Sequence, residues 1–137
     1  MGVTLAEVAD CGAAEARQAI DAAAAAFATW GSATVYEHSA ALQRWHDLVM
    51  AYEAALGQLM TQEMGKPIGE AHGEVRYAAG FINWYAEEAK RVGGDIVPSQ
   101  FAHTCLLVNQ QPVGGLVAIT PWNFPAAMIT RNEHSKG

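Results

Sequence analysis

The stretch over residues 113–131, VGGLVAITPWNFPAAMITR, constrains the fold of this chain more than any other part of its sequence. An apolar, β-branched run over residues 116–120 is typical of a buried strand. Pro121 and Pro125 stop the strand, because proline has no backbone N–H to donate to a ladder. Residues 126–130, which begin with small and unbranched side chains, can then open a helix. The pattern predicts a strand that feeds a ligand-binding loop.

The loop offers little chemistry apart from the side chain of Asn123. This residue lies between an indole and a phenyl ring and is flanked by two prolines, so stiff neighbours would hold its carboxamide in place. A carboxamide N–H held still and away from bulk water can stabilise an oxygen that gains negative charge in a transition state. Removing one such donor costs about 3 kcal/mol. The local pattern also permits a structural interpretation, because Trp and Phe next to prolines are common at core corners and Arg131, past a turn, is commonly a solvated charge.

Helix periodicity dominates the first part of the chain. Residues 13–30 are alanine-rich with a shallow apolar face, and Gly31 is well placed to end a helix there. The string TVYE is a capping box, in which the Thr34 oxygen can accept the N–H of Glu37 while the carboxylate of Glu37 accepts the backbone N–H of Thr34. A second helix is therefore predicted to begin at this box.

A third helix is predicted to end at Gly65, with Pro67 just beyond it. The pair Gly65 and Lys66 invites comparison with a phosphate-binding loop. That comparison fails, because the glycine five residues upstream and the hydroxyl residue after the lysine are both missing. The pair is interpreted as a helix terminator.

A fourth helix is predicted from Pro67 or Glu70 to the glycine pair at 93–94. Phe81 and Trp84 widen its apolar face, so we expect that face to be covered on more than one side.

Residues 104–111, TCLLVNQQ, are predicted to form a strand, followed by a turn over residues 112–115. Three apolar residues in a row would make an unpaired edge strand prone to aggregation. A partner that covers this strand is therefore expected on physical grounds. Cys105 lies in the strand and is assigned no catalytic role.

Composition excludes several classes of function. Fourteen acidic against eight basic residues give a net charge of -6, which argues against nucleic acid or an anionic membrane as the main partner. The five histidines have no metal-ligand spacing, so no metal site is expected. Cys11 and Cys105 are isolated thiols, which are expected to be reduced. The opening residues carry acidic side chains and no basic region of a signal peptide, so a soluble cytoplasmic protein is expected.

The string TPWNFP, placed after an expected strand, resembles the signature of the NAD(P)-dependent aldehyde dehydrogenases. The longer string PWNFPAAMITR is closer still to the succinate-semialdehyde dehydrogenases of that family. EMGKPIGEAHGEV and WYAEEAKRVGGDIVP resemble the amino-terminal helical part of the same group, so the resemblance covers nearly the whole chain. It implies an α/β fold class: amino-terminal helices plus the first strands of a Rossmann-like cofactor domain, incomplete and mainly helical as it stands.

The resemblance also implies residue roles in the oxidation of an aldehyde such as succinate semialdehyde. Asn123 would be an oxyanion-hole donor, and Arg131 would bind the substrate carboxylate. If the residues between them were all helical, Arg131 would lie about 12 Å beyond Asn123, from where a guanidinium could reach back to a four-carbon acid. The sequence leaves the choice between NAD and NADP open. The nicotinamide site would be lined by Ile119, Thr120, Pro121 and Trp122.

Three segments are expected: a helical part of the cofactor-binding domain over residues 1–100, an oligomerisation strand over residues 101–115, and the truncated start of the catalytic core over residues 116–137. The family implies a homo-oligomer through residues 104–111. Its nucleophilic cysteine and general-base glutamate are expected downstream of this sequence, and the pattern is lost after Arg131. No turnover is therefore expected from this chain alone. The alternative is a non-catalytic helical protein that self-associates.

Overall fold

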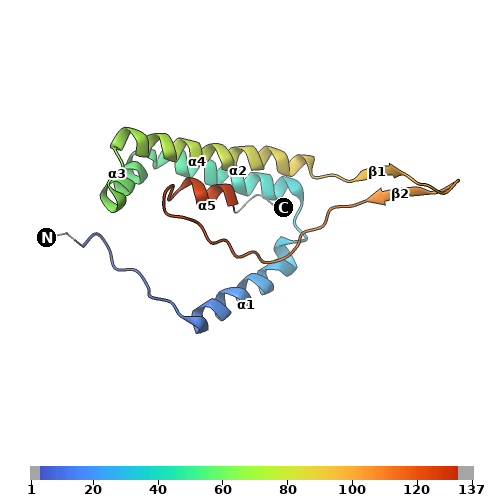
Figure 1. Ribbon diagram of the computed structural model, residues 1–137, viewed down its shortest axis with the longest axis horizontal. Helices are drawn as coiled ribbons and strands as arrows, with labels where there is room; N and C mark the ends of the chain where they lie inside the picture. The colour runs from blue at the N-terminus through green and yellow to red at the C-terminus, as the bar shows by residue number, and fades with distance from the viewer. Residues whose placement is uncertain (1–3, 133–137) are drawn as a thin grey trace.

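The computed structural model describes residues 4–132, which are mainly helical (Figure 1). The helix α4 lies at the centre of a helical layer, because α2, α3 and α5 all pack against it. The helix α1 and a β-hairpin stand away from this layer (Figure 1). The expected fold class, an incomplete and mainly helical α/β arrangement, is confirmed. In chain order the elements are α1 (Ala13–Trp30), α2 (Val35–Ala51), α3 (Glu53–Met64), α4 (Ile68–Glu88), the 3₁₀ helix η1 (Ala89–Arg91), β1 (Asp95–Pro98), β2 (Cys105–Val108) and α5 (Ala127–Asn132).

The ends of the first two helices agree with the sequence predictions. Gly31 follows α1 and donates its N–H to the Phe27 carbonyl at 2.8 Å. At the start of α2, Glu37 donates its N–H to the Thr34 hydroxyl at 3.2 Å, and the Thr34 N–H donates to the Glu37 carboxylate at 2.7 Å. The predicted capping box is therefore confirmed. No residue of α1 is buried, because its alanines offer little surface to pack.

The turn between α3 and α4 is also the one that the sequence predicts. Gly65 ends α3 with a φ of 77°, a left-handed conformation that favours glycine, and Pro67 immediately precedes α4. Beyond the turn, Arg76 of α4 pairs with Glu53 of α3 at 2.5 Å. The α-helix ends at Glu88, and the turn of 3₁₀ helix separates it from the glycine pair that the sequence indicates as the stop.

The core follows one face of α4. Its largest fully buried side chains are Val75 and Ile82, and alanines between them let the neighbouring helices approach closely. The expectation that this face is covered on more than one side is only partly met, since Trp84 keeps 62% of its surface exposed. The buried residues of α4 are Ala71, Glu74, Val75, Ala78, Ala79, Ile82 and Ala86.

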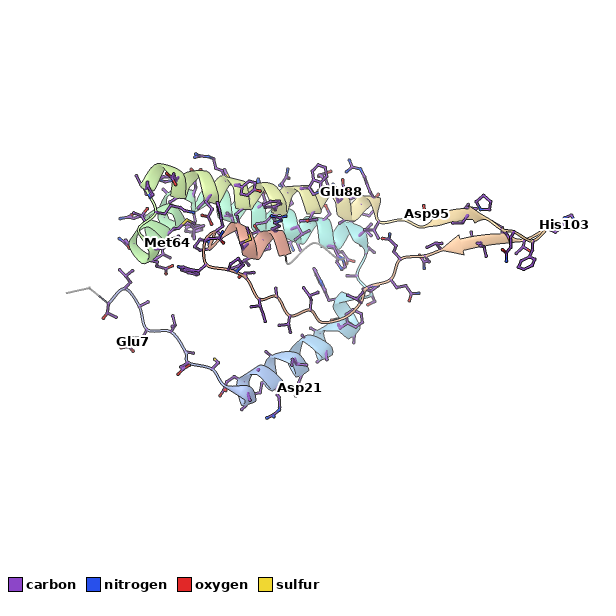
Figure 2. The ribbon with its side chains drawn as sticks, in the orientation of Figure 1. Glu7, Asp21, Met64, Glu88, Asp95 and His103 are labelled. Carbon is purple, nitrogen blue, oxygen red and sulfur yellow. The ribbon has the colours of Figure 1, made fainter. Side chains whose placement is uncertain are left out.

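The predicted strand at residues 104–111 is confirmed as the shorter β2. It pairs antiparallel with β1, with Ile96 opposite Leu107 and Val97 opposite Leu106. The four-residue strand β1, which ends in a proline, was not predicted from the sequence. The hairpin runs from Asp95 away from the helices to a tip near His103, and all residues of both strands are exposed (Figure 2).

The prediction of a buried strand over residues 116–120 is wrong. This segment forms no strand and is largely solvent-exposed, and Ile119 keeps 94% of its surface accessible. A strand of a parallel sheet needs neighbours on its edges and helices on its faces. Within residues 4–132 the sheet consists of the hairpin alone, so no neighbour is available. The helix predicted to open at residues 126–130 is confirmed as α5, and the predictions for residues 133–137 lie outside the described residues.

Candidate active-site loop

The TPWNFP stretch (residues 120–125) forms a turn-rich loop between α5 and the extended segment that begins at Leu116. Asn123 is exposed at its centre, and Trp122 beside it keeps 60% of its surface accessible. The loop lies at the end of the helical layer where α3 meets α4, because Lys66 from that turn contacts it. The loop therefore presents its amide to solvent while its backbone is held from behind.

The strongest hold on the loop comes from Glu74, a carboxylate in the apolar face of α4. Glu74 Oε1 accepts the backbone N–H of Ala126 at 2.9 Å and that of Ala127 at 3.3 Å. Its other oxygen forms an ion pair with Lys66 Nζ. Hydrogen bonds to a charged acceptor are roughly twice as strong as those between neutral groups. The carboxylate thus joins the loop to the centre of the core.

Lys66 adds two contacts on the other side of the loop. Its Nζ lies 3.4 Å from the backbone oxygen of Asn123 and 4.3 Å from the centre of the Phe124 ring. A cation over an aromatic face is attracted by the quadrupole of the ring. The lysine that the sequence analysis treated only as part of a helix terminator is therefore part of the support of this loop.

The residues after the loop are buried. Ala127 is fully buried, and Ala126 packs on a core cluster formed by Met60, Ala71 and Val75. Thr130 is buried and donates its hydroxyl to the Ala127 carbonyl at 3.3 Å. The start of α5 is therefore fixed by packing as well as by hydrogen bonds.

The predicted site residues lie in the extended segment, on the loop and on α5. Arg131 is exposed on α5, and Asn123 is exposed on the loop before it. The helix begins only at Ala127, so the condition under which Arg131 would lie about 12 Å beyond Asn123, a helix over all the residues between them, is not met. The predicted nicotinamide-site residues run from the end of the extended segment into the first half of the loop, and Thr120 among them is half-buried; they are Ile119, Thr120, Pro121 and Trp122.

Two hollows mark the surface elsewhere. One, of about 490 Å³, runs along the aromatic residues of α4, including Phe81 and Trp84. The other, of about 250 Å³, lies between Phe27 of α1 and the glycines at 114 and 115. None of the predicted site residues lines either of these two hollows.

Sequence reasoning missed Glu74 and Lys66 as parts of the site. A signal was present for Glu74, since it lies three residues after Ala71 and four before Ala78, on the apolar face of α4. A carboxylate at such a position is almost never fully buried unless it is paired. No comparable signal in the sequence identifies the loop as its partner, because the two are more than fifty residues apart.

Other kinds of site receive no support from the described residues. Within residues 4–132, no group of three or more histidine, cysteine or acidic side chains could hold a metal ion. The same range holds no helix with the length and apolar character needed to cross a membrane. Cys11 and Cys105 are free and exposed, and Cys105 lies in the hairpin at the opposite end of the molecule from the loop (Figure 1).

Comparison with known proteins gives a consistent picture. Residues 1–133 match the model of the aldehyde dehydrogenase family. The chain is 51% identical to the NADP(+) succinate-semialdehyde dehydrogenase of Escherichia coli, over 95% of this chain and 27% of that protein. It is also 51% identical to the glutarate-semialdehyde dehydrogenase of Pseudomonas putida, with the same two shares.

The fold agrees with these sequence matches. The crystal structure of succinate-semialdehyde dehydrogenase from Burkholderia pseudomallei superposes with a TM-score of 0.93 at 50% identity, covering 97% of this chain and 28% of that one. This chain therefore spans about a quarter of the length of the relatives it matches, and it corresponds to their amino-terminal part.

Proposed function

Because the chain belongs to the aldehyde dehydrogenase family, we propose that it supplies the amino-terminal part of an NAD(P)-dependent enzyme that oxidises succinate semialdehyde or a related aldehyde to the acid. The observation that carries this proposal is the exposed carboxamide of Asn123 on a loop whose backbone is anchored from behind. The names of the relatives support a semialdehyde substrate, whose far end is a carboxylate.

Asn123 is the group that acts on the reacting atoms. When a nucleophile attacks the aldehyde carbon, the carbonyl oxygen gains negative charge, and a fixed amide N–H can donate to it. Such a donor is effective because it needs no reorganisation at the moment of reaction. The nucleophile and the base that activates water are not assigned to this chain, so we propose that the chain alone has no turnover.

Arg131 is proposed as the clamp for the substrate carboxylate. It is the fifth residue of α5, about 6 Å along the helix axis from Ala127, where the helix begins. A guanidinium can bind a carboxylate through two parallel hydrogen bonds, which fixes the orientation of the substrate as well as its position. The exposure of both Arg131 and Asn123 leaves room for a small acid to contact them.

The cofactor proposed for the complete enzyme is NAD or NADP, whose nicotinamide accepts the hydride from the substrate. The end of the extended segment and the start of the loop fit one wall of such a site, because Ile119 and Trp122 expose apolar surface suited to a planar ring. The name of the relative from E. coli supports NADP for that protein. The residues proposed to form this wall are Ile119, Thr120, Pro121 and Trp122.

Segment boundaries, assembly and location complete the proposal. Residues 1–100 would form the helical part of the cofactor-binding domain, residues 101–115 the oligomerisation strand, and residues 116–137 the start of the catalytic core. The proposed assembly is a homo-oligomer through residues 104–111, whose strand β2 has one unpaired edge in this two-stranded sheet. The proposed location is the cytoplasm.

A second candidate function is non-catalytic self-association. Exposed apolar side chains on α4 and on the extended segment favour it, since such surface is commonly covered by a partner. It predicts a concentration-dependent oligomer that binds neither NAD nor NADP. Titration of both cofactors against this chain, together with size-exclusion chromatography, tests this candidate. Specific binding of NAD or NADP would count against non-catalytic self-association.

The test of the proposed function is a chimera. Residues 4–131 would replace the matching segment of the E. coli relative, and formation of reduced nicotinamide would report turnover of succinate semialdehyde. We expect an active chimera in which Asn123→Ala lowers kcat by about 10²- to 10³-fold. The matched control is Asn83→Ala, which removes an exposed carboxamide from α4 and should leave kcat unchanged. If Asn123→Ala retains the kcat of the unmodified chimera, the amide has no oxyanion role.

A further inference from the structure

The carboxylate of Glu74 is almost completely buried, although it belongs to a chain whose other acidic residues lie largely at the surface. The residue keeps 4% of its surface exposed, and its side chain only 1%. A buried charge is costly unless it is paired and hydrogen-bonded. The partners of the Glu74 carboxylate therefore indicate the structural role of its charge.

Each of the three recorded partners of this carboxylate lies outside its own helix. Oε1 accepts the N–H groups of Ala126 and Ala127, which follow the loop, and Oε2 pairs with Lys66, in the turn between α3 and α4. A carboxylate that only had to be neutralised would need the lysine alone. The two additional bonds connect α4 to a segment more than fifty residues away.

Lys66 holds the loop from the other side of Asn123. Its side chain keeps 11% of its surface exposed, its Nζ lies 3.4 Å from the Asn123 carbonyl oxygen, and it contacts the ring of Phe124. The left-handed glycine at position 65 reverses the chain just before this lysine. The ion pair thus contacts the peptide groups on both sides of Pro125 and leaves the Asn123 side chain free in solvent.

We propose that Lys66 and Glu74 are positioning residues for the Asn123 carboxamide. Glu74 fixes the peptide groups after the loop, and Lys66 fixes the carbonyl of Asn123 itself. An oxyanion donor is effective only when it is aimed before the reaction begins, and a misplacement of about 1 Å can cost about 10²-fold in rate. The proposal rests on the proposed function for what Asn123 does, but the anchoring is a property of this chain alone.

The test measures the loop directly, by amide hydrogen exchange and ¹⁵N relaxation on the full chain. Glu74→Gln keeps the size of the side chain and removes its charge. We expect the N–H groups of Ala126 and Ala127 to exchange at least about tenfold faster, because a hydrogen bond to a charged group contributes about 1.5 to 3 kcal/mol. The loop should also gain fast motion, while α2, α3 and α4 keep their protection.

The matched control is Glu87→Gln, which removes the charge of another glutamate of α4 and breaks its exposed ion pair with Lys90 of η1. In this variant the N–H groups of Ala126 and Ala127 should exchange at the same rates as in the unmodified chain. On the lysine side, Lys66→Arg should keep the loop ordered and Lys66→Met should loosen it. This pair of variants separates the need for a cation from the need for a long side chain.

A double variant, Lys66→Met with Glu74→Gln, covers the case in which a single variant fails to fold, because it leaves no unpaired charge. The proposal is overturned if the loop amides of a folded variant without the Glu74 charge stay as protected and as rigid as before. It is equally overturned if the double variant loses protection in α2, α3 and α4 together with the loop. The pair would then support the whole core and not this loop in particular.

These readouts need neither substrate nor cofactor, so they can fail independently of the proposed function. If Glu74→Gln loses loop order and the Asn123→Ala chimera is still active, the anchoring role of Glu74 is supported and the oxyanion role of Asn123 is excluded. If Glu74→Gln keeps its loop order and the Asn123→Ala chimera is inactive, the anchoring role is excluded and the oxyanion role is supported.

Discussion

Glu74 and Asn123 illustrate how differently two polar side chains can be used within one small region. Glu74 is buried and satisfied by backbone N–H groups and a lysine, whereas Asn123 is exposed and held only through its backbone. Buried polar groups require partners, and exposed ones are free to find a ligand. Because the buried Glu74 and its partner Lys66 bind the backbone of the loop, the side chain of Asn123 can be exposed and still have a fixed position.

Arg131 carries the residue-scale prediction. In the chimera with the E. coli relative, Arg131→Ala should lower kcat/KM for succinate semialdehyde by about 10- to 100-fold, since a charged hydrogen-bonding partner of the substrate is lost. An uncharged aldehyde of similar length should be affected little. Parallel steady-state assays with the two substrates measure the difference. Arg91→Ala, which removes an arginine exposed on η1, is the matched control and should affect neither substrate. Equal losses for both aldehydes would exclude the clamp.

The start of α2 shows how an element depends on a local hydrogen-bonded unit. The backbone N–H of Thr34, and then its hydroxyl, hold the pKa of Glu37 below its ordinary value of 4.5. A carboxyl group whose pKa is lowered on folding stabilises the folded state at pH values above its ordinary pKa. That contribution is lost as the pH falls through the lowered value, because protonation removes the negative charge that strengthens the hydrogen bonds from Thr34.

This linkage predicts a pH-dependent helix. Helicity measured by circular dichroism should fall more steeply below about pH 4.5 in the unmodified chain than in Glu37→Gln, in which the carboxyl is absent. Glu15 and Asp47 also have lowered pKa values, from backbone hydrogen bonds and from hydrogen bonds of His46 and Gln43 respectively. The difference between the two proteins isolates Glu37 from these groups. Identical pH profiles would show that the charge of Glu37 contributes nothing to the stability of the helix.

The extended segment at residues 116–120 is the element that sequence and structure treat differently. Its β-branched residues have the propensity of a strand, but propensity describes a side chain that fits a pleated, half-buried surface. In the described chain no second strand lies beside it and its apolar residues remain exposed. A strand needs a second strand to bind its backbone N–H and C=O groups, whereas a helix forms these hydrogen bonds within itself.

At the scale of the whole molecule, only part of the chain is packed. The helical layer encloses the core, while α1 and the hairpin extend away from it (Figure 1). Both carry large apolar side chains in solvent, including Ile20 on α1 and Leu107 on β2. Surface of this kind favours association, and the open edge of a two-stranded sheet offers backbone groups for pairing.

Self-association through the hairpin is the prediction that belongs to this scale. Leu107→Lys should weaken it, because a lysine on an edge strand opposes pairing with a second copy. Leu107 keeps 77% of its surface exposed, so the change should not disturb the fold. Sedimentation velocity over a range of concentrations measures the effect. Val8→Lys, which adds the same charge at an exposed site before α1, is the control. Equal association of the two variants would place the interface elsewhere.

The strand at β2 was predicted without its partner β1, whereas the helices, the capping box of α2 and the likeness to a family were determined by the sequence itself. These features depend on residues three or four positions apart, such as Thr34 and Glu37, or on a string that can be compared directly. Short-range hydrogen bonds close with little loss of chain entropy, so local sequence is enough to specify them.

Only the tertiary structure decided how the loop is held and which apolar segments are covered. Glu74 meets Ala126 across 52 positions, and β1 becomes a strand because β2 lies beside it. Such contacts require distant parts of the chain to meet, and the pattern around each residue does not name its partner. The same reason explains why a strand was expected at residues 116–120. Its local pattern is that of a strand, and the neighbour that would make it one is not among the described residues.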